Sequence, residues 1–535
     1  MMERHFPTKT NVGLQPVTAQ RAPQRGLRVW RHLLSLTLLS TLPGMAMANP
    51  ADLFGLGARA ASMGNTFTAV ADDPSAAFYN LGGLSQIKRP TISVGMQLGH
   101  FALGNPDACP EPDGVGCSEP FYYTESGVQK IQQKRYGYDE PHGVTLGLAM
   151  PLSKKLNFGL TTYVPMNITY DENGNIVGVG MRLARFKTID PYVPDYVMFQ
   201  NRAQRFSMYG GVSYEPVPGL GIGVGVLVLA NASMVMDING TVAATSVDGE
   251  TSVATQLNPL ITLDLIPKSR PALGLFWNLG MLSPSLQAWQ VGLSYRSAID
   301  IQGSAVINTD LAVSAQLAED EAPLSYGASI AGLSLTFLDF YTPHTVAMGV
   351  SGRIGDRVRL AADVTWNHWS GFQASVVSLP EAVALPLGLS LALQESREVD
   401  LSKIRDTLTP KIGVEGRLGP YLTNSKLRGV DLYVRGGLNY EPNPFPLQTG
   451  LNNLLNSDRL VTSAGVGATT INPFVKGRDL PISLDLSTQY HYLVPTDHVK
   501  DQPAGNIPAD GTPVGGQYTS QGSVFQGALT LQMGF

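Results

Sequence analysis

The sequence predicts an all-β fold, a transmembrane antiparallel β-barrel of about fourteen strands. Three observations lead to this prediction: an export signal near the N-terminus, long stretches in which apolar and polar residues alternate, and short connections that alternate with long ones. Of the 535 residues, 43% are hydrophobic, only 15% are charged and 57 are glycine. After residue 50 there is no run of ~20 apolar residues, which is the length of a transmembrane helix.

The export signal is expected to occupy residues 1–48. Four arginines precede the apolar run 33–42, and the Ala-Met-Ala triplet 46–48 follows it. A basic region, a short apolar region and an A-x-A site indicate a secretory signal peptide, which we expect to be cleaved after Ala48. A transmembrane anchor is the alternative, but the apolar run is too short for one. Because the stretch before the run is unusually long, one hypothesis is that translation begins downstream, near Leu27 or Val29.

Alternation with a period of two runs through the chain from about Thr91. In 358–366 the even positions are apolar and the odd ones mostly polar or small, and the pattern recurs in 290–296, 431–440 and 482–492. Such alternation indicates strands with one face toward lipid and the other toward water. Charged residues in mid-strand favour a wet lumen over the core of a β-sandwich. The glycine-rich run 219–225 is interpreted as a strand with its glycines toward the lumen.

The connections provide the second pattern. Links 151–155, 215–219 and 353–356 are short, whereas the expected outer loops are long and cover 101–141, 167–203, 239–285, 311–343, 367–406, 441–458 and 494–523. Bacterial barrels have short periplasmic turns, long outer loops and an even number of strands. Besides the four alternating segments above, strands are expected to begin near residues 91, 142, 156, 204, 220, 299, 345, 407, 459 and 524.

The last strand ends the chain on an aromatic residue. Phe525, Leu529, Leu531, Met533 and Phe535 share one face of this strand. An aromatic terminus on an alternating strand resembles the signal read by the barrel assembly machinery, so we expect Phe535 to be recognised by it. With the signal peptide, this predicts the outer membrane of a Gram-negative bacterium, where lipid and lipopolysaccharide surround the barrel.

The charge and the cysteines exclude some partners. The formal net charge is −5 and no basic stripe is present, which argues against binding of nucleic acid. Cys109 and Cys117 lie close together in a Pro/Gly/Asp-rich stretch and predict a disulfide that clips a loop. A metal site is the less favoured alternative, because no histidine or second cysteine pair lies nearby. We expect neither a metal nor a cofactor.

The segment after the signal contains three ordered motifs: G-x-G-A-R-A-x-x-M-G at 55–64, A-x-A-D-D-x-S-A at 69–76 and N-x-x-G-L at 80–84. This set resembles the N-terminal hatch of the FadL/TodX (OmpP1-type) outer-membrane protein family. Strand and loop signatures of the same family are resembled by three further segments, 289–297, 356–369 and 435–446. The resemblance therefore spans essentially the whole mature chain.

The resemblance implies a barrel at 91–535 with a hatch, 49–90, folded inside the lumen. It also implies passive uptake of long-chain fatty acids or other hydrophobic compounds. Outer loops would capture the substrate, a pocket above the hatch would receive it, and a gap in the barrel wall would release it sideways. The family places a kink in the third strand, here about 156–165. Pro165 marks the expected gap, because proline favours edges and bulges.

The hatch residues expected to matter are Arg59, Asp72, Asp73, Asn80 and Gly82. One of these positions departs from the family pattern, whose Asn-Pro-Ala becomes Asn-Leu-Gly at 80–82. Proline fixes φ, whereas glycine is permissive. The hatch tip is therefore expected to be more flexible than in the family.

Three of the expected outer loops are rich in apolar residues, although loops should face water. In two of them we expect a substrate-binding groove formed by Leu263, Leu265, Leu273, Phe276, Trp277, Leu333, Leu335, Phe337 and Phe340. Exposed apolar patches of this size mark binding surfaces. The alternative is that these segments pack on one another over the barrel mouth, and both can hold at once. For the third loop, 376–393, neither alternative is preferred.

Arginines in the lumen could attract the carboxylate of a ligand. Arg296 and Arg435 project from predicted strands and are the candidates. The alternative is that these arginines pair with carboxylates of the wall or of the hatch, such as Glu415, Asp485 or Asp72.

Two other functions compete with the channel. A barrel that anchors loops for adhesion to a host or phage needs no hatch. A barrel enzyme such as a phospholipase needs a catalytic constellation, but G-x-S-x-G and H-E-x-x-H motifs are absent and His368, His491 and His498 are scattered. The sequence therefore favours a monomeric channel that is not an enzyme. It leaves open whether the substrate is a long-chain fatty acid or an aromatic or alkane hydrocarbon.

Overall fold

The computed structural model describes the chain from residue 50 to its end, with internal gaps. The described residues are 50–104, 121–124, 127–130, 141–170, 176–181, 195–196, 198–199, 206–247, 250–316, 324–372, 382–384, 390–392, 403–419, 429–448, 454–471, 480–499 and 517–535. The predicted signal peptide, Cys109 and Cys117 lie outside them. No helix in these ranges is long and apolar enough to cross a membrane.

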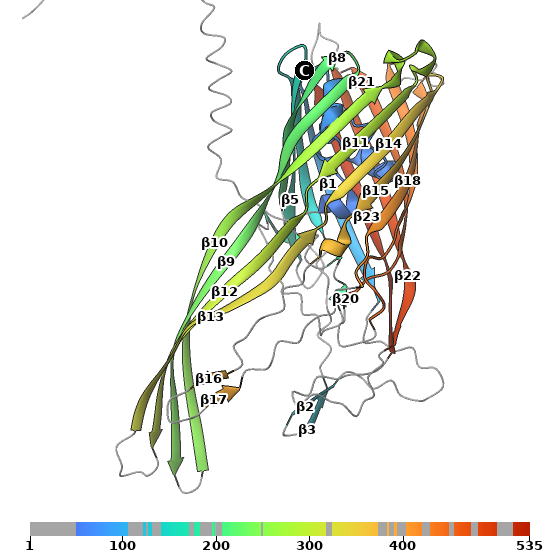
Figure 1. Cartoon of the computed structure of the whole chain (residues 1–535). Coiled ribbons are helices and arrows are strands. Elements are labelled where there is room, and N and C mark those ends of the chain that lie inside the picture. Colours follow the sequence, from blue (N-terminus) through green and yellow to red (C-terminus); the bar gives the residue numbers. More distant parts are fainter. Residues whose placement is uncertain are drawn as a thin grey trace, which may run out of the picture. The chain divides into compact units, whose positions relative to one another are not determined.

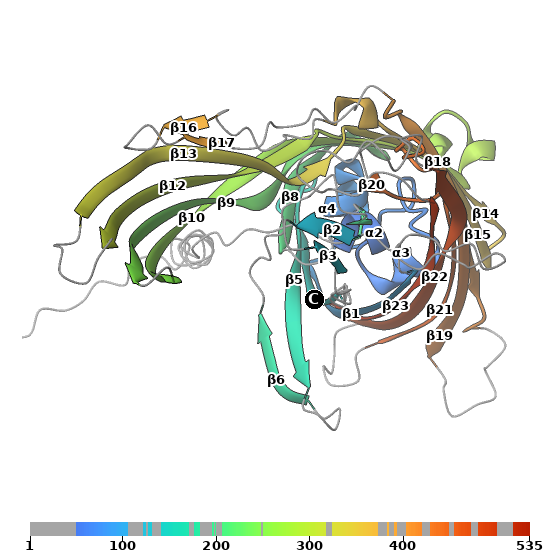
Figure 2. The same ribbon diagram turned by 90° about the horizontal axis from the view of Figure 1, so that it is seen from below.

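Fourteen strands close into one antiparallel barrel, as predicted. Each strand pairs with the next one in the ring, and β23 pairs with β1 to close it. The ring consists of β1 (Thr91–Leu103), β4 (His142–Pro151), β5 (Leu156–Tyr170), β8 (Ser207–Val217), β9 (Leu220–Val247), β10 (Glu250–Asn278), β11 (Trp289–Arg296), β14 (Thr345–Ile354), β15 (Val358–Asn367), β18 (Thr407–Arg417), β19 (Val430–Glu441), β21 (Arg459–Ile471), β22 (Pro481–Val499) and β23 (Gln517–Gly534). Figure 1 shows these strands from the side and Figure 2 shows the ring from below.

Several short elements lie outside the ring. They are the strands β2 (Phe121–Thr124), β3 (Gly127–Lys130), β6 (Ile176–Met181), β7 (Asp195–Tyr196), β16 (Ala382–Ala384), β17 (Ser390–Ala392) and β20 (Leu454–Leu455), and the 3-10 turns η2 (Leu279–Met281), η3 (Pro284–Leu286) and η4 (Trp369–Gly371). Of these strands, β6 pairs with the outer end of β5, while β2 pairs with β3 and β16 with β17.

The alternation predicted the two faces of the wall correctly. On β15, Leu360 and Val364 are 46% and 47% exposed on the outer face, whereas Arg359 and Asp363 are only 7% and 3% exposed on the inner face. The apolar face is thus the exposed one, as expected where lipid covers the outside. In the glycine-rich strand β9, Ile222 likewise faces outward. The inner face is buried because the hatch, rather than water, fills the lumen at this level.

The prediction assigned one ring strand wrongly. The expected loop 239–285 contains all of β10, and residues 272–278 of β10 pair with β11 in the ring. The strand expected from Ile299 is β12 (Ile299–Gln316), which pairs with β13 (Leu324–Thr342) and with β9 but is not part of the ring. Prolines at 259, 267 and 271 hid β10, because proline in a run argues against a central strand.

β9 and β10 continue beyond the ring and form, with β12 and β13, a four-stranded extension of the same sheet, which we call the arm. It consists of residues 229–271 of β9 and β10 together with β12 and β13, in the order β10-β9-β12-β13. Figure 1 shows these strands side by side. The expected loops 239–285 and 311–343 are therefore largely β-structure.

The hatch is a set of short helical turns: α2 (Pro50–Phe54), α3 (Ala58–Ser62), α4 (Ala76–Tyr79) and η1 (Leu81–Gln86). Figure 2 shows α2, α3 and α4 inside the ring. The first family-like motif forms α3 and its two ends. Gly57 precedes α3 with a φ of 82° and Gly64 follows it with a φ of 66°, a backbone region that favours glycine.

Side chains of the wall satisfy backbone groups of the hatch. Gln97 Nε2 donates to the carbonyl of Gly55 at 2.8 Å, and Gln489 Nε2 donates to that of Ala61 at 2.9 Å. On the other side, the backbone N–H of Thr68 donates to Asp363 Oδ2 at 2.9 Å. Helices of four or five residues leave most of their backbone groups unpaired, so these contacts are what allows the hatch to be buried.

The hatch tip is fixed by close contact with the wall. Asn80 is fully buried, and its Nδ2 donates to the carbonyls of Thr68 at 2.8 Å and Leu275 at 2.9 Å. A Cβ on Gly82 would lie 2.6 Å from the backbone nitrogen of Phe276 and 2.8 Å from the Gly221 carbonyl oxygen. The departure from Asn-Pro-Ala therefore serves a close backbone approach, and the structure gives no support to the expected flexibility of the tip.

Candidate functional site

A pocket of about 110 Å³ lies in the lumen between α2 of the hatch and the ends of the strands that face the long connections. Its wall residues include Thr345, Thr407 and Arg459, which stand at the first positions of β14, β18 and β21. These ends face outward in a bacterial barrel. The pocket is therefore on the outer side of the hatch, in the region where the family resemblance led us to expect one.

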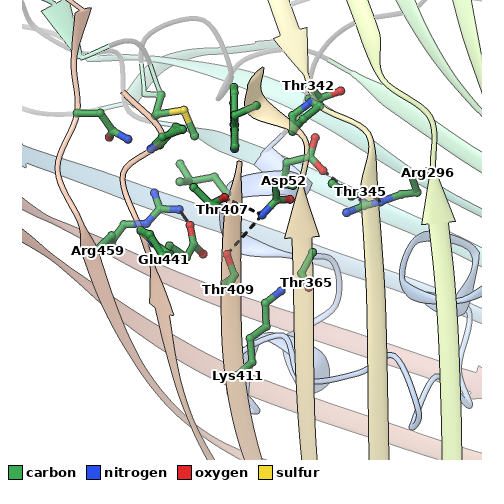
Figure 3. A pocket seen from close by; sticks show the side chains of 18 of the residues that line it. Asp52, Arg296, Thr342, Thr345, Thr365, Thr407, Thr409, Lys411, Glu441 and Arg459 are labelled. Atoms are coloured by element: carbon green, nitrogen blue, oxygen red, sulfur yellow. Dashed lines mark hydrogen bonds and ion pairs between the residues drawn. The ribbon is translucent and has the colours of Figure 1, made fainter. Parts of the chain in front are cut away.

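Hydroxyl groups line the middle of this pocket (Figure 3). Five threonines contribute to it: Thr342, Thr345, Thr365, Thr407 and Thr409. They come from β13, β14, β15 and β18, where alternation turns every second residue inward. Asn367 Nδ2 donates to Thr407 Oγ1 at 3.3 Å and to Thr409 Oγ1 at 3.4 Å.

Cations outnumber carboxylates in the lining. Arg270, Arg296, Lys411 and Arg459 carry four positive charges, against two negative charges on Asp52 and Glu441. Glu441 forms an ion pair with Arg459. Asp52 of the hatch is then the one lining carboxylate left to balance the other three cations. With a net charge of +2, the lining favours an anionic ligand.

The two arginines beside Asp52 belong to neighbouring strands of the wall. Arg296 Nη1 on β11 lies 3.3 Å from Asp52 Oδ1, and Arg270 Nη2 on β10 lies 3.9 Å from Asp52 Oδ2. The Arg296 guanidinium also covers the ring of Phe78, with 4.4 Å between its Cζ and the ring centroid. Arg270 Nη1 donates to Thr342 Oγ1 at 2.6 Å. This hydrogen bond links β10, just before its ring segment, to the end of β13.

Part of the remaining lining is apolar. This part consists of Leu53, Met198, Trp369 and three prolines, Pro343, Pro442 and Pro444, while Asn456 and Ser457 add two more polar groups. Trp369 belongs to a buried aromatic cluster with Tyr341, Phe372 and Phe445, whose ring centroids lie 5.3–6.0 Å apart. The pocket thus joins a cationic and hydroxyl-rich part to an apolar part, the combination that an amphiphile with an anionic head requires.

A second group of charges lies on the other side of the hatch. Glu415 Oε2 on β18 accepts from Arg59 Nε at 2.9 Å and from Arg435 Nε at 2.8 Å, and Arg435 Nη1 donates to Asp485 Oδ1 at 2.6 Å. Arg359 Nη1 lies 3.3 Å from Asp72 Oδ2. We call these six residues the lower network. They border a pocket of about 480 Å³ next to the short turn 355–357.

The two hatch aspartates differ in their surroundings. Burial favours the neutral form of Asp72, but the guanidiniums of Arg59 and Arg359 more than offset this and lower its pKa below the usual value. Burial raises the pKa of Asp73, which the more distant Arg59 and hydrogen bonds from Ser75 oppose only in part. Asp72 is thus a member of the lower network, whereas Asp73 accepts from the backbone N–H and hydroxyl of Ser75 within the hatch.

Comparison with known proteins decides the family. A family model described as "Outer membrane protein transport protein (OMPP1/FadL/TodX)" matches residues 43–476. The chain belongs to this FadL/TodX family. It is accordingly an outer-membrane protein of a family that transports hydrophobic compounds.

Solved structures of the FadL/TodX type align with most of the chain at low sequence identity. A FadL homologue from Pseudomonas aeruginosa is 15% identical, with 92% of this chain and 99% of that chain covered and a TM-score of 0.49. The toluene transporter TodX from Pseudomonas putida is 13% identical (90% and 99% covered, TM-score 0.46), and so is the toluene transporter TbuX from Ralstonia pickettii (90% and 99% covered, TM-score 0.43). No curated protein sequence matches the chain.

The structure separates the two candidate arginines of this FadL/TodX protein. Arg296 lines the pocket on the outer side of the hatch, where it contacts Asp52. Arg435 does not reach that pocket. It pairs with Glu415 and Asp485 in the lower network, which was the alternative considered for both arginines. Arg296 therefore remains a candidate for a ligand carboxylate, and Arg435 has a structural partner on each side.

Three residues of the expected loop groove lie in the barrel wall instead. Leu273, Phe276 and Trp277 belong to the part of β10 that pairs with β11. Leu273 faces outward and is 50% exposed, whereas Phe276 is 3% exposed and faces the hatch. These three cannot contribute to an outer groove, because the loop expected there is a ring strand.

The other six residues of the expected groove lie in the arm. Paired residues of neighbouring strands share a face of the sheet. Two rows across the arm are Leu263–Met234–Ala305–Leu335 and Ile261–Met236–Ile307–Leu333. Leu265 pairs with Ala232, Phe337 with Gly303 and Phe340 with Ile301, all positions of the same alternation. By register, all six therefore share one face, and the rows of this face are apolar.

Pro165 lies where β5 loses its neighbour in the ring. The pairing between β5 and β8 ends at Tyr163 and Ser207, and β5 pairs with β6 again only from Met166 onward. Pro165 stands between these two points and pairs with Gly143 of β4 on the other side. Among the described residues, Val164 and Pro165 of β5 therefore have no ladder partner on the side of β8.

Sequence reasoning missed Asp52, Arg270 and Lys411 as pocket residues. Arg270 fell in a stretch that was expected to be a loop. Lys411 could have been found, because it alternates with Thr407 and Thr409 on a predicted strand. Asp52 lies before the first hatch motif, and nothing in the sequence indicates its arginine partners. Among the described residues, no cluster of His, Cys, Asp and Glu could hold a metal ion.

Proposed function

We propose that this FadL/TodX protein is a passive channel for the uptake of long-chain fatty acids. The observation that carries the proposal is the pocket beside α2, which combines four cations and five threonines with an apolar side. An alkane gains nothing from arginines and lysine, and an aromatic hydrocarbon gains only a cation–π contact. A carboxylate gains the stronger charge-assisted hydrogen bonds. Arg296 is the residue expected to bind the carboxylate.

Capture is proposed to occur on the apolar face of the arm, which carries Leu263, Leu265, Leu333, Leu335, Phe337 and Phe340 by register. An apolar face of this extent suits the alkyl chain of a fatty acid. The arm also leads to the pocket. β13 ends at Thr342, which lines the pocket, and Tyr341 packs against Trp369 and Phe372.

Release is proposed to occur sideways, through the seam between β5 and β8 that Pro165 marks. The alternative route, straight through the lumen, would take an alkyl chain past the lower network. That network is charged and buried, and desolvating it with an apolar chain is costly. The hatch residues Arg59 and Asp72 would then serve to close the lumen rather than to bind substrate.

We further propose that the protein is not an enzyme. His498 and Ser520 are buried and adjacent, with 3.0 Å between Nε2 and Oγ. However, His498 Nδ1 accepts the backbone N–H of Gln448 at 3.1 Å, which places the ring proton on Nε2. The imidazole thus donates to the serine and cannot act as its general base in this arrangement.

The remaining expectations about partners are kept as proposals. We propose a monomer that is surrounded by outer-membrane lipid and lipopolysaccharide. Phe535 is 51% exposed at the end of the ring, where its side chain is accessible for recognition by the barrel assembly machinery. Cross-linking in intact outer membranes would test the monomer, and a Phe535→Ala variant would test assembly through its yield of folded barrel.

Calorimetry on the refolded barrel tests the substrate. We expect oleate to bind and Arg296→Gln to weaken this binding about tenfold, the loss of one charge-assisted contact worth ~1.4 kcal/mol. Arg417→Gln is the matched control, because Arg417 pairs with Asp431 at the other end of the wall. Binding of toluene but not oleate, indifferent to Arg296→Gln, would replace this proposal with hydrocarbon uptake.

A further inference from the structure

A carboxylate already occupies the position where the ligand's carboxylate is expected. Both oxygens of Asp52 face an arginine of the wall, Oδ1 toward Arg296 at 3.3 Å and Oδ2 toward Arg270 at 3.9 Å. Asp52 belongs to the hatch and the two arginines belong to the barrel. Figure 3 shows Asp52 among the labelled residues of the pocket, with Arg296 beside Thr345.

These two contacts are loose. Charge-assisted hydrogen bonds between nitrogen and oxygen are normally about 2.7–2.9 Å long. In the lower network, the hatch residue Arg59 reaches that length, with 2.9 Å from its Nε to Glu415 Oε2, whereas Arg359 Nη1 lies 3.3 Å from Asp72 Oδ2. The lower side of the hatch thus has one short ion pair with the wall, at Arg59, whereas both ion pairs of Asp52 in α2 are long. The Asp52 pairs also lie in the pocket, so they are the hatch–wall ion pairs that a ligand carboxylate can replace.

Arg270 has donor capacity that Asp52 does not use. The residue is only 2% exposed, and its Nε has no hydrogen-bond partner among the described residues. Its Nη1 donates to the carbonyl of Ser297 at 2.9 Å and to Thr342 Oγ1 at 2.6 Å. A buried guanidinium with an unused donor is costly. A carboxylate that fitted between Arg270 and Arg296 more closely than Asp52 would therefore bind favourably.

We propose that Asp52 is a resident carboxylate that an anionic ligand must displace from Arg270 and Arg296. The proposal rests on the proposed function and adds a specificity residue to it. Displacement exchanges one carboxylate for another, so the charge of the pocket is conserved and the hatch loses its contact at α2. A neutral compound cannot make this exchange, so Asp52 makes the release of α2 specific for acids.

The exchange predicts that removing a charged pocket residue, Asp52, raises the affinity for oleate instead of lowering it. Asp52→Asn removes the internal competitor but keeps the size of the side chain. We expect this variant to bind oleate about tenfold more tightly than the parent and to bind oleyl alcohol, which has the same chain without the charge, unchanged. Asp52→Glu keeps the competitor and is the matched control, with oleate affinity within about threefold of the parent. Calorimetry of the refolded full barrel gives all of these affinities.

A second measurement follows the hatch itself. Ala51 is 2% exposed and neighbours Asp52 in α2. In a barrel with Ala51→Cys, Cys109→Ser and Cys117→Ser, we expect oleate to accelerate maleimide labelling of the new cysteine several-fold, and oleyl alcohol to leave it unchanged. Equal labelling with both compounds would overturn the exchange.

The two proposals fail in different ways. If Arg296→Gln weakens oleate binding while Asp52→Asn does not strengthen it, the fatty-acid pocket stands and the resident carboxylate is refuted. If oleate does not bind the parent barrel or either variant, the proposed substrate itself is wrong. Because Asp52→Asn is expected to gain affinity, a variant that merely misfolds cannot imitate the expected result.

Discussion

Arg59 Nε lies 2.9 Å from Glu415 Oε2, and this ion pair joins the hatch to β18 of the wall. Glu415 also accepts from Arg435 and lies 3.6 Å from Arg359 Nη1. One carboxylate therefore balances parts of three guanidiniums in a buried position. In this geometry Glu415 is a counter-charge that one hatch arginine and two wall arginines share.

Glu415→Gln is expected to destabilise the barrel strongly. The substitution leaves three buried guanidiniums with too little negative charge, and removal of one partner from a buried ion pair typically costs ~3–5 kcal/mol. The measurement is urea unfolding of the refolded barrel, followed by the change in gel mobility between folded and unfolded forms. Asp431→Asn is the control, because its pair with Arg417 is about 40% exposed and should contribute little. Equal losses in both variants would contradict the special role of Glu415.

Gly82→Ala is expected to displace the hatch tip. The added methyl group would meet the backbone of β9 and β10 rather than a movable side chain, and overpacking of this kind costs ~1–3 kcal/mol. The same unfolding assay measures it, with Gly527→Ala as the control, since a Cβ there meets nothing within 4 Å. A tip that was flexible, as the departure from Asn-Pro-Ala suggested, would tolerate the alanine without loss.

Local patterns explain how much of the fold could be predicted. Alternation is a property of each strand by itself, so local pattern located all of the ring strands except β10 and gave the lipid-facing side of those in which the alternation is clear, such as β15 and β22. β10 escaped because it carries three prolines, and β12 was added because it has a strand pattern but lies in the arm. Whether a strand belongs to the ring depends on which strands it pairs with, and the alternation within one strand carries no information about its partners.

The same reasoning explains what could be predicted of the site. The inward direction of Arg296 follows from the alternation of β11, but its partner Asp52 lies 244 residues away in the sequence. Arg435 also points inward by the alternation of its strand, but its surroundings differ from those of Arg296. It forms ion pairs with Glu415 on β18 and Asp485 on β22. The type and spacing of residues gave the candidates, and only the packing of the hatch distinguished the pocket from the lower network.

The apolar face of the arm is expected to set the rate of uptake at low substrate concentration. In the double variant Leu263→Ser with Leu335→Ser, one apolar row is lost, and burial of each leucine is worth ~1.5–3 kcal/mol. Uptake of radiolabelled oleate by cells should fall at least tenfold, because a loss of only ~1.4 kcal/mol of this binding free energy already corresponds to a factor of ten. Val235→Ser with Val306→Ser is the matched control, because these residues pair between the neighbouring arm strands β9 and β12 and lie, by register, on the opposite face. If both double variants slow uptake equally, the arm has a structural role and no capture face.

Lys411→Met is expected to weaken ligand binding without weakening the fold. Lys411 lines the pocket, and the structure gives its ammonium neither an ion pair nor a hydrogen bond with any described residue. The carboxylates of Glu441 and Asp363 attract this ammonium only from beyond ion-pair distance. Partial burial of a charge without a direct contact costs free energy, so a methionine of similar length should leave the unfolding midpoint unchanged or raise it. The affinity for oleate should fall about tenfold, the loss of one charged contact of ~1.4 kcal/mol, while that for oleyl alcohol stays the same. Lys154→Met, on an exposed turn, should change neither quantity. If the unfolding midpoint falls and the affinities for oleate and oleyl alcohol fall equally, Lys411 stabilises the wall and does not bind the carboxylate.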